Sequence, residues 1–432
     1  MTGYAEFLAG KQRRVPPAGR VVGDADVHPA LHPWQRQVVA WAVRTGRAAL
    51  WEDTGLGKTW QSLEFARLSG ARALVVAPLA VCRQTVREAA RIGIEARYAR
   101  SDADAAGPGI WVTNYEMALR FAPDALDVVV LDEASILKQS DGKTRTALIR
   151  HFAGVKHRLA CTATPAPNDI EELTSQAEFL GVMPRAEMLA AYFVHDQDGW
   201  RVKGHARRPM FAWMASWAVA MRRPSDIGGD DDGYILPGYD IVPHLLPVDV
   251  VPEGQLFATD LGGVGGRAAI RKATLEARCG RTAGLVAAEP GEPWIIWCGL
   301  NAEADLLARL IPGAVNVHGS LSPEEKADAL LGFADRDIRV LVSKPSICSF
   351  GMHWPHCARM VFCGLSDSWE AFYQAIRRCH RYGQSRRVQV HVVLSELEGR
   401  IAENVARKER QAGQMTGELV AEMRAAGELR MP

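Results

Sequence analysis

Short, almost continuous apolar runs recur along the first part of the chain and alternate with segments of helical periodicity. The runs are residues 47–51, 73–78, 109–113, 127–131 and 155–161, and helices are expected over about 31–44, 60–69 and 81–91. Continuous apolar runs are typical of parallel strands that helices cover on both faces. The pattern therefore predicts an α/β unit whose ligands bind at the carboxyl ends of the strands.

A second alternation of the same kind begins at Pro293. It predicts strands at 294–298, 314–317, 339–342, 359–363 and 388–393, and helices at 302–310 and from Ser322 to about Phe333. Ser322 and Glu325 have the spacing of a capping box, which marks a helix start. The predicted fold class is therefore α/β, with two units that each hold a parallel sheet flanked by helices.

The alternation stops between about Met183 and Pro247, where helices and loops inserted between the two sheets are expected. Trp200, Trp213 and Trp217 are mixed here with arginines and lysines. Such residues can stack on bases and contact phosphates. Alternatively, the tryptophans are core and the basic residues form a solvated face, and the sequence leaves both possibilities open.

These patterns define five segments. The expected boundaries are 1–28 for a polar lead-in, 29–182 for the first α/β unit, 183–250 for the insertion, 251–400 for the second unit and 401–432 for a C-terminal helix. Most of 252–288 is expected to be helical.

Composition excludes few classes of function but indicates the cellular compartment. The chain has 432 residues and a formal net charge of +1, so its overall charge does not require a nucleic-acid partner. Its eight cysteines form no CxxC pair, which favours a reducing, cytoplasmic setting. No structural zinc is expected, because the spacing of His353, His356 and Cys357 is not a usual zinc pattern. No membrane span is expected, since no apolar run reaches about 18 residues.

The clearest chemical signal is the stretch from Asp53 to Thr59 between the first strand and the helix at 60–69. It fits the phosphate-loop pattern GxxxxGK[ST], except that Asp53 replaces the first glycine. Such a loop cradles phosphates with its backbone N–H groups, and the following helix directs its positive end at the anion. The expected nucleotide contacts are Thr54, Gly55, Leu56, Gly57, Lys58 and Thr59. Lys58 can reach the β- and γ-phosphates, and the Thr59 hydroxyl can ligate Mg²⁺.

Two carboxylates follow the most apolar strand of the first unit. Asp132 is expected to hold Mg²⁺, and Glu133 to orient and deprotonate an attacking water. An Asp–Glu pair alone is weak evidence, because acidic pairs often open helices. Its position about 75 residues after the phosphate loop strengthens the assignment.

Three further groups are weaker candidates. Gln35 can read an adenine edge through its amide, although an exposed helix glutamine is the simpler interpretation without the loop. Thr162 and Thr164 can link the nucleotide site to the neighbouring unit, or Thr164 can cap a helix. Arg378 and Arg381, three residues apart, can share a helix face and act as arginine fingers, or form an ordinary basic helix end.

Together these motifs resemble the superfamily 2 helicase-type ATPases, and most closely their chromatin-remodeller-like branch with its phage and prophage members. The stretches that carry the resemblance are LHPWQ, TGLGKT, LVVAPLAV, VTNYEMA, LDEAS, TATPAPND, VHGSLSPEEK, SKPSICSFGMHW and QAIRRCHRYGQ. The last keeps the QAxxRxxRxGQ spacing whole. The similarity extends over about residues 30–400, with Ser135 where the branch usually has His.

The resemblance implies two RecA-like lobes, with ATP and Mg²⁺ in the cleft between them and nucleic acid crossing both lobes. It implies that Lys58, Glu133, Arg378 and Arg381 are catalytic, that Gly351 contacts the nucleotide, and that Thr162, Thr164 and Gln374 couple ATP use to movement. It also suggests the cytoplasm of a bacterium or of a phage-infected host.

Three functions fit these motifs. The first is an ATP-dependent translocase or helicase acting on double-stranded or branched DNA in replication, recombination or repair. The second is an RNA helicase of the same superfamily, which the spelling of residues 374–384 disfavours. The third is a nucleotide-gated nucleic-acid clamp with little turnover, which the complete set of Lys58, Glu133 and Arg381 disfavours.

Overall fold

The computed structural model describes residues 14–138, 142–167, 169–197, 199–247, 270–348, 352–365 and 368–426. These residues form two compact units. The first takes in the chain up to Tyr234 together with the segment from Gln411 onward, and the second runs from Ile235 to Arg410. The expected boundaries at 182 and 250 stay predictions.

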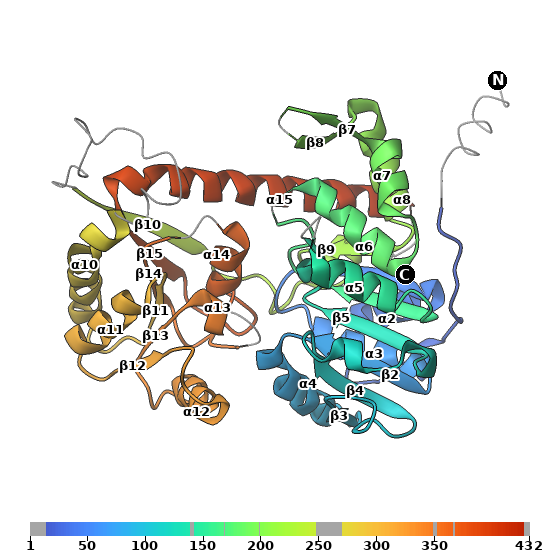
Figure 1. Cartoon of the computed structure of the whole chain (residues 1–432), viewed down its shortest axis with the longest axis horizontal. Coiled ribbons are helices and arrows are strands. Elements are labelled where there is room, and N and C mark those ends of the chain that lie inside the picture. Colours follow the sequence, from blue (N-terminus) through green and yellow to red (C-terminus); the bar gives the residue numbers. More distant parts are fainter. Residues whose placement is uncertain are drawn as a thin grey trace. The chain divides into compact units, whose positions relative to one another are not determined.

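The first unit is built on a sheet of seven strands in which every neighbouring pair is parallel (Figure 1). The strands are β1 (Arg47–Glu52), β2 (Arg72–Ala77), β3 (Ala96–Tyr98), β4 (Gly109–Asn114), β5 (Val128–Asp132), β6 (His157–Cys161) and β9 (Ala218–Met221). Their order across the sheet is β3-β4-β2-β5-β6-β1-β9. Strands β5 and β6 are buried along their whole length, as the apolar runs predicted.

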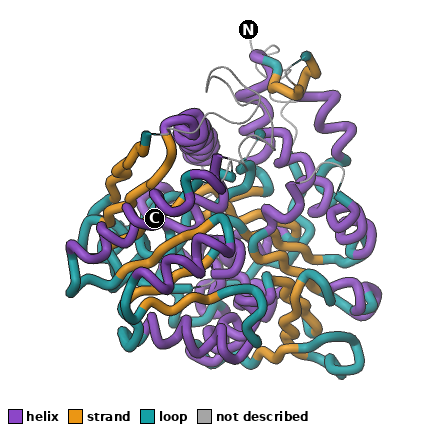
Figure 2. The backbone as a smooth tube through the Cα atoms, turned by 60° about the vertical axis from the view of Figure 1, so that its left-hand side comes forward, coloured by secondary structure: helices purple, strands orange, loops and turns teal. Residues whose placement is uncertain are grey.

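Helices lie beside the strands of the first unit, and several of them contact the sheet (Figure 2). They are α2 (Pro33–Thr45), α3 (Lys58–Ser69), α4 (Leu79–Arg91), α5 (Lys143–His151), α6 (Leu173–Leu180), α7 (Arg185–Tyr192) and α8 (Arg207–Met214). Helix α3 contacts β2, β4, β5 and β6, while α6 contacts β1 and β6. The strand–loop–helix order around the phosphate loop is confirmed, since α3 begins at Lys58 directly after β1 and its loop.

The second unit repeats the plan with six parallel strands in the order β10-β15-β14-β11-β13-β12. The strands are β10 (Tyr239–Leu246), β11 (Trp294–Cys298), β12 (Ala314–Val317), β13 (Val340–Ser343), β14 (Arg359–Cys363) and β15 (Val388–Ser395). The helices are α10 (Leu275–Ala288), α11 (Asn301–Leu310), α12 (Pro323–Ala334), α13 (Pro345–Cys348) and α14 (Trp369–Ile376). The Ser322 cap of α12 is confirmed, because its hydroxyl accepts from the Glu325 N–H.

The expectation of only helices and loops between 183 and 247 is wrong. Strands β7 (Phe193–Asp196) and β8 (Gly199–Val202) form a hairpin, β9 completes the first sheet beside β1, and β10 completes the second beside β15. Strand β9 has only four residues, and β10 alternates half-buried and exposed positions. Strand β10 lacks the continuous apolar run on which the prediction relied, and the apolar residues of β9 continue directly from the apolar stretch of α8, so no break in the pattern marks a separate strand.

The tryptophans of this region are mostly core. Trp213 and Trp217 are buried and contact each other edge to face, with their ring centroids 5.3 Å apart. Trp200, in the β7–β8 hairpin, is 36% exposed. The core interpretation therefore holds for two of the three rings.

Helix α15 (Gly399–Ala426) begins in the second unit, and its part from Gln411 onward belongs to the first. Met415, Leu419 and Val420 on that part are buried. Arg207 of α8 pairs with Glu418 at 2.6 Å. The expected C-terminal helix is thus present as an element shared by both units. No helix in the described ranges combines the length and apolarity that crossing a bilayer requires.

Candidate functional site

Three neighbouring strands of the first unit end in the segments that carry the predicted chemistry. Strand β6 lies between β1 and β5, with Cys161 paired to Leu50 on one side and to Asp132 on the other. The phosphate loop follows β1, Glu133 follows β5, and Thr162 follows β6. The topology therefore brings together three segments that are far apart in sequence.

The phosphate loop turns on two glycines. Gly55 and Gly57 have φ values of +90° and +84°, in the left-handed region that favours glycine. A Cβ on Gly57 would also lie 2.3 Å from Nε2 of Gln35. Gln35 is buried and donates from Nε2 to the Leu56 carbonyl at 2.9 Å, while its Oε1 accepts from the His32 N–H. One N–H and one lone pair of this amide remain, so its adenine contact stays a prediction.

Asp53 stands in the position of the first glycine of the pattern, and its carboxylate accepts a hydrogen bond there that a glycine could not accept. Its Oδ1 accepts a hydrogen bond from the Thr54 N–H at 2.7 Å, and its own N–H donates to the Met221 carbonyl of β9 at 2.8 Å. A side-chain carboxylate thus organises the start of the loop, and the loop is tied to the edge strand β9.

The Lys58 ammonium folds back on the loop. Its Nζ donates to the carbonyls of Glu52 and Asp53 at 2.7 and 3.0 Å. The same charge acts on Asp132: burial raises the pKa of that carboxyl, and the Lys58 ammonium opposes the shift. Lys58 and Asp132 are therefore electrostatically linked across the site.

Glu133 has an unusual backbone. Its φ of +58° lies in the left-handed region, where a non-glycine residue is strained. Its Oε2 accepts a long hydrogen bond from the Thr162 hydroxyl at 3.5 Å, and that hydroxyl in turn accepts from the Thr164 N–H at 3.1 Å. The next described helical segment begins at Ile170 with Asp169 as its N-cap, so Thr164 does not have its alternative role as a helix cap. Strain at the proposed base is the kind that occurs at functional sites.

The arginines of the second unit are not arranged as predicted. Helix α14 ends at Ile376, so Arg378 and Arg381 lie beyond it and do not share a helix face. After Ile376 the chain changes to tighter turns, in which the Arg378 N–H donates to the Ala375 carbonyl, and the Arg378 carbonyl accepts from the Trp354 N–H. Both guanidiniums nevertheless donate to the Met352 carbonyl, at 3.3 and 2.9 Å.

Arg378 is nearly buried and also pairs with Gln374, which accepts at Oε1 from the guanidinium at 2.8 Å. Arg381 is only partly buried. The two arginines thus differ in their surroundings: Arg378 is packed in the interior of the second unit, whereas Arg381 is partly open to solvent. Gly351 lies outside the described residues.

Sequence reasoning missed three residues around the loop. Glu52, at the end of β1, is fully buried, and burial raises its pKa to about 7 against the opposing charge of Lys58. Gln61 donates from Nε2 to Glu52 at 2.8 Å and to the Leu56 carbonyl at 3.1 Å. Tyr115 donates its hydroxyl to the Asp132 carbonyl at 2.7 Å. An acidic residue ending an apolar strand was the signal that could have identified Glu52.

The residues present fit ATP with Mg²⁺. The Thr54 hydroxyl is buried without a hydrogen-bond partner among the described residues, so the loop offers an unused donor. Next to it are the lysine ammonium and the two left-handed glycines already described. Asp132 and Thr59 supply the oxygen ligands that Mg²⁺ prefers. The loop is therefore a candidate phosphate cradle beside a pair of carboxylates.

Comparison with known proteins agrees with this geometry. Residues 34–193 match the SNF2-related domain, and residues 279–383 match the helicase conserved C-terminal domain. No curated protein matches the chain significantly. Among solved structures, the SWI2/SNF2 ATPase core from Sulfolobus solfataricus in complex with dsDNA is 20% identical, with a TM-score of 0.45, over 95% of this chain and 98% of that one.

The two domain matches include the phosphate loop, the Asp132–Glu133 pair, Arg378 and Arg381. They occur in the order expected for two successive α/β lobes. The chain is therefore a superfamily 2 helicase-type ATPase of the chromatin-remodeller-like branch, a nucleic-acid-dependent ATP hydrolase.

Proposed function

We propose that this protein is a translocase that uses ATP hydrolysis to move along double-stranded or branched DNA in replication, recombination or repair. The observation that carries the proposal is the convergence of Lys58, Asp132 and Glu133 at the carboxyl edge of the first sheet. The SNF2-related domain supports DNA as the track. The resemblance to phage and prophage members favours a bacterial or phage-infected cytoplasm.

In this proposal the phosphate loop holds the triphosphate. The backbone N–H groups at Gly55 and Gly57 and the Thr54 hydroxyl donate to phosphate oxygens. Lys58 exchanges the carbonyls that it contacts here for the β- and γ-phosphates. Asp132 and Thr59 hold Mg²⁺, which neutralises phosphate charge when bound.

Glu133 is the proposed general base. Its carboxylate accepts the proton of the attacking water, which makes the water a stronger nucleophile. The Thr162 hydroxyl, 3.5 Å from Glu133 Oε2, helps to orient that carboxylate. Because Thr162 and Thr164 are hydrogen-bonded to each other, a shift at Glu133 can be passed to the segment after β6.

The second unit supplies Arg378 and Arg381, whose guanidiniums we propose to stabilise the charge that develops on the γ-phosphate. Their hydrogen bonds to Met352 link them to the SKPSICSFGMHW stretch that contains Gly351. Gln374 holds Arg378 in place and couples the arginines to α14.

The test is ATP turnover measured at one salt concentration with no nucleic acid, single-stranded DNA, duplex DNA, forked DNA or RNA. Strong stimulation by duplex or forked DNA supports the proposal, and stimulation by RNA alone replaces it with an RNA helicase. If no nucleic acid stimulates turnover, the clamp function is favoured.

The role of the base is tested in the same assay with Glu133→Gln. We expect this variant to bind ATP normally and to lose turnover by roughly 100-fold or more, the range for losing a general base. Glu95→Gln, an exposed substitution elsewhere in the first unit, is the matched control. Unchanged turnover in Glu133→Gln would sink the assignment.

A further inference from the structure

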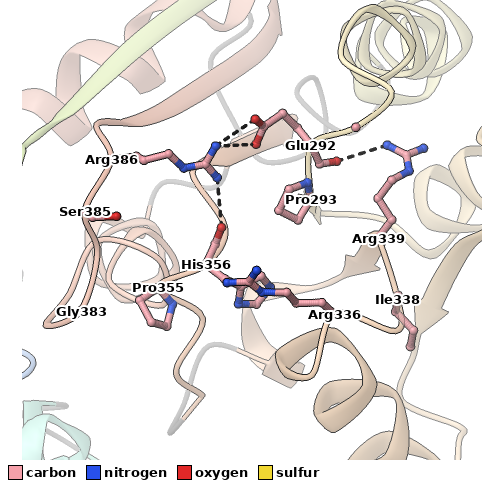
Figure 3. A pocket seen from close by; sticks show the side chains of 11 residues that line it. Glu292, Pro293, Arg336, Ile338, Arg339, Pro355, His356, Gly383, Ser385 and Arg386 are labelled. Atoms are coloured by element: carbon pink, nitrogen blue, oxygen red, sulfur yellow. Dashed lines mark hydrogen bonds and ion pairs between the residues drawn. The ribbon is translucent and has the colours of Figure 1, made fainter.

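A polar hollow lies in the second unit, at the amino edge of its sheet. Ligands of parallel sheets usually bind at the opposite, carboxyl edge. Its volume is about 550 Å³ (Figure 3). The polar side chains that line it are Glu292, Arg336, Arg339, His356, Ser385 and Arg386. They come from the short segments directly before β11, β13, β14 and β15, so the hollow is at the amino edge of the sheet.

The charge of this hollow is unbalanced. Arg386 pairs with both oxygens of Glu292 at 2.9 Å. Arg339 donates only to the Glu292 backbone carbonyl, at 3.3 Å. Arg336 has no carboxylate within ion-pair distance among the described residues, and its positive charge acts on His356. Three guanidiniums thus face one carboxylate.

His356 adds no compensating negative charge and behaves as a neutral donor or acceptor. Burial and the charges of Arg336 and Arg386 lower its pKa, so the ring is uncharged at neutral pH. Its Nε2 is buried without a hydrogen-bond partner among the described residues. The wall of the hollow therefore has both excess positive charge and an unused polar atom.

The backbone at Arg336 is also unusual. Helix α12 ends in a left-handed turn, in which the Asp337 N–H donates to the Gly332 carbonyl at 2.8 Å. Arg336 occupies the left-handed position at φ +71°, where glycine or asparagine is usual. An arginine there is strained, and strained residues at a cavity wall are a sign of function.

We propose that this hollow binds a phosphate group between Arg336, Arg339 and Arg386. Guanidiniums present planar pairs of N–H donors that match phosphate oxygens. The phosphate can belong to a nucleic-acid backbone or to a small free phosphate compound, and both sources share this chemistry. The proposal does not depend on how ATP is hydrolysed.

Three variants probe the site. Arg336→Asn removes the guanidinium that pairs with no carboxylate among the described residues, and asparagine tolerates the left-handed backbone. Glu292→Gln removes the competing carboxylate while keeping its shape. Arg309→Gln removes a similar exposed charge from α11, outside the hollow, and is the matched control.

The first arm measures the affinity for a fluorescein-labelled duplex DNA by anisotropy over a salt series, without nucleotide. If the phosphate belongs to nucleic acid, Arg336→Asn weakens binding roughly three- to tenfold, as expected for one charge-assisted contact near the surface. Its slope of log K against log salt falls by about 0.9. Glu292→Gln binds more tightly, and Arg309→Gln behaves as the wild type.

The second arm titrates inorganic pyrophosphate without DNA and follows Tm, with Lys58→Ala in every protein to remove binding at the phosphate loop. If the hollow takes a free phosphate, Tm rises to a plateau in the Lys58→Ala parent, less in Arg336→Asn and more in Glu292→Gln.

The proposal is overturned if Arg336→Asn and Glu292→Gln match Arg309→Gln in both arms. A role of Arg336 only in ending α12 would lower Tm without changing either binding curve, and that result also overturns it. If Arg336→Asn does not fold, the opposite effect expected for Glu292→Gln decides alone.

Discussion

Gln61 donates a hydrogen bond from Nε2 to a carboxylate oxygen of Glu52 at 2.8 Å, beneath the phosphate loop. The other Glu52 oxygen is buried with no hydrogen-bond partner among the described residues. An ionised carboxylate is costly in such a place, which is why the pKa of Glu52 is raised to about 7.

The first prediction concerns stability and pH. From about pH 4.5 to pH 7, the folded protein keeps a proton on Glu52 that the unfolded chain has released, so the free energy of unfolding falls as the pH rises through this window. The full effect is roughly 3 kcal/mol. Glu52→Gln cannot ionise, so we expect it to raise Tm at pH 8 relative to the wild type, and much less at pH 5.

Thermal unfolding of both proteins at the two pH values measures this difference. Other titrating groups are common to both proteins and cancel. Glu95→Gln, at an exposed carboxylate, should show no such dependence on pH. Parallel Tm curves for wild type and Glu52→Gln would mean that Glu52 ionises normally.

The second prediction concerns Gly57. In Gly57→Ala the new Cβ meets the Gln35 amide, 2.3 Å away, and must also adopt a φ of +84°. The left-handed backbone alone costs about 1–2 kcal/mol for a residue with a Cβ. We expect ATP affinity to fall at least tenfold, measured by equilibrium binding of a fluorescent ATP analogue.

Gly154→Ala is the control, because a Cβ there meets nothing within 4 Å. Trimming Gln35 as well, in Gln35→Ala/Gly57→Ala, relieves the clash but not the backbone strain, and Gln35→Ala alone is the reference because Gln35 is a predicted adenine contact. Affinity should therefore recover only in part, and full recovery would assign the whole effect to the clash.

The third prediction separates Arg378 from Arg381. Arg378 is buried and bonded to Gln374 and Met352, so Arg378→Ala should lower Tm by several degrees as well as turnover. Arg381 is partly exposed, so Arg381→Ala should lower kcat with little change in Tm or in ATP affinity. Turnover, ATP binding and Tm of the two variants are compared side by side. Equal losses of Tm would show that both are packing residues.

The fourth prediction concerns the part of α15 that belongs to the first unit. Leu419 is 2% exposed, so Leu419→Ala should destabilise that unit by about 2–4 kcal/mol. Gly413→Ala, in the same helix, adds a Cβ that meets nothing within 4 Å and should stabilise it by up to about 1 kcal/mol. Denaturant unfolding followed by tryptophan fluorescence measures both. Opposite signs are expected, and a Leu419→Ala variant as stable as the wild type would show that this contact contributes little.

Most strands of both units were predictable because consecutive apolar residues indicate a strand that is buried on both faces. Strands β11, β12 and β14 begin and end as expected, and β5 differs by one residue. The short strands β3 and β9 were not predicted, although β12, which also has four residues, was. Their place depends on pairing with β4 and β1, which only the folded chain provides.

The candidate site divides in the same way. Lys58 and Asp132 were found because their chemistry follows strands directly. Three other features depend on backbone angles and burial, which the sequence does not state. They are the strain at Glu133, the hydrogen bond that Asp53 accepts from the Thr54 N–H, and the raised pKa of Glu52. The end of α14 before Arg378 was missed because the chain passes there into tight turns, in which the Ala375 and Ile376 carbonyls accept from the N–H groups of Arg378 and Cys379.

The shared helix α15 has a consequence for the order of folding during synthesis. Arg207 and its partner Glu418 are separated by 211 positions, and the whole second unit is translated between them. When all seven strands of the first sheet have left the ribosome, the part of α15 that contacts α8 has not yet been translated. The surface of α8 therefore stays uncovered until residues 411–426 emerge. During that interval the first unit lacks the buried side chains of Met415, Leu419 and Val420, so it reaches its full stability only after the second unit has been translated.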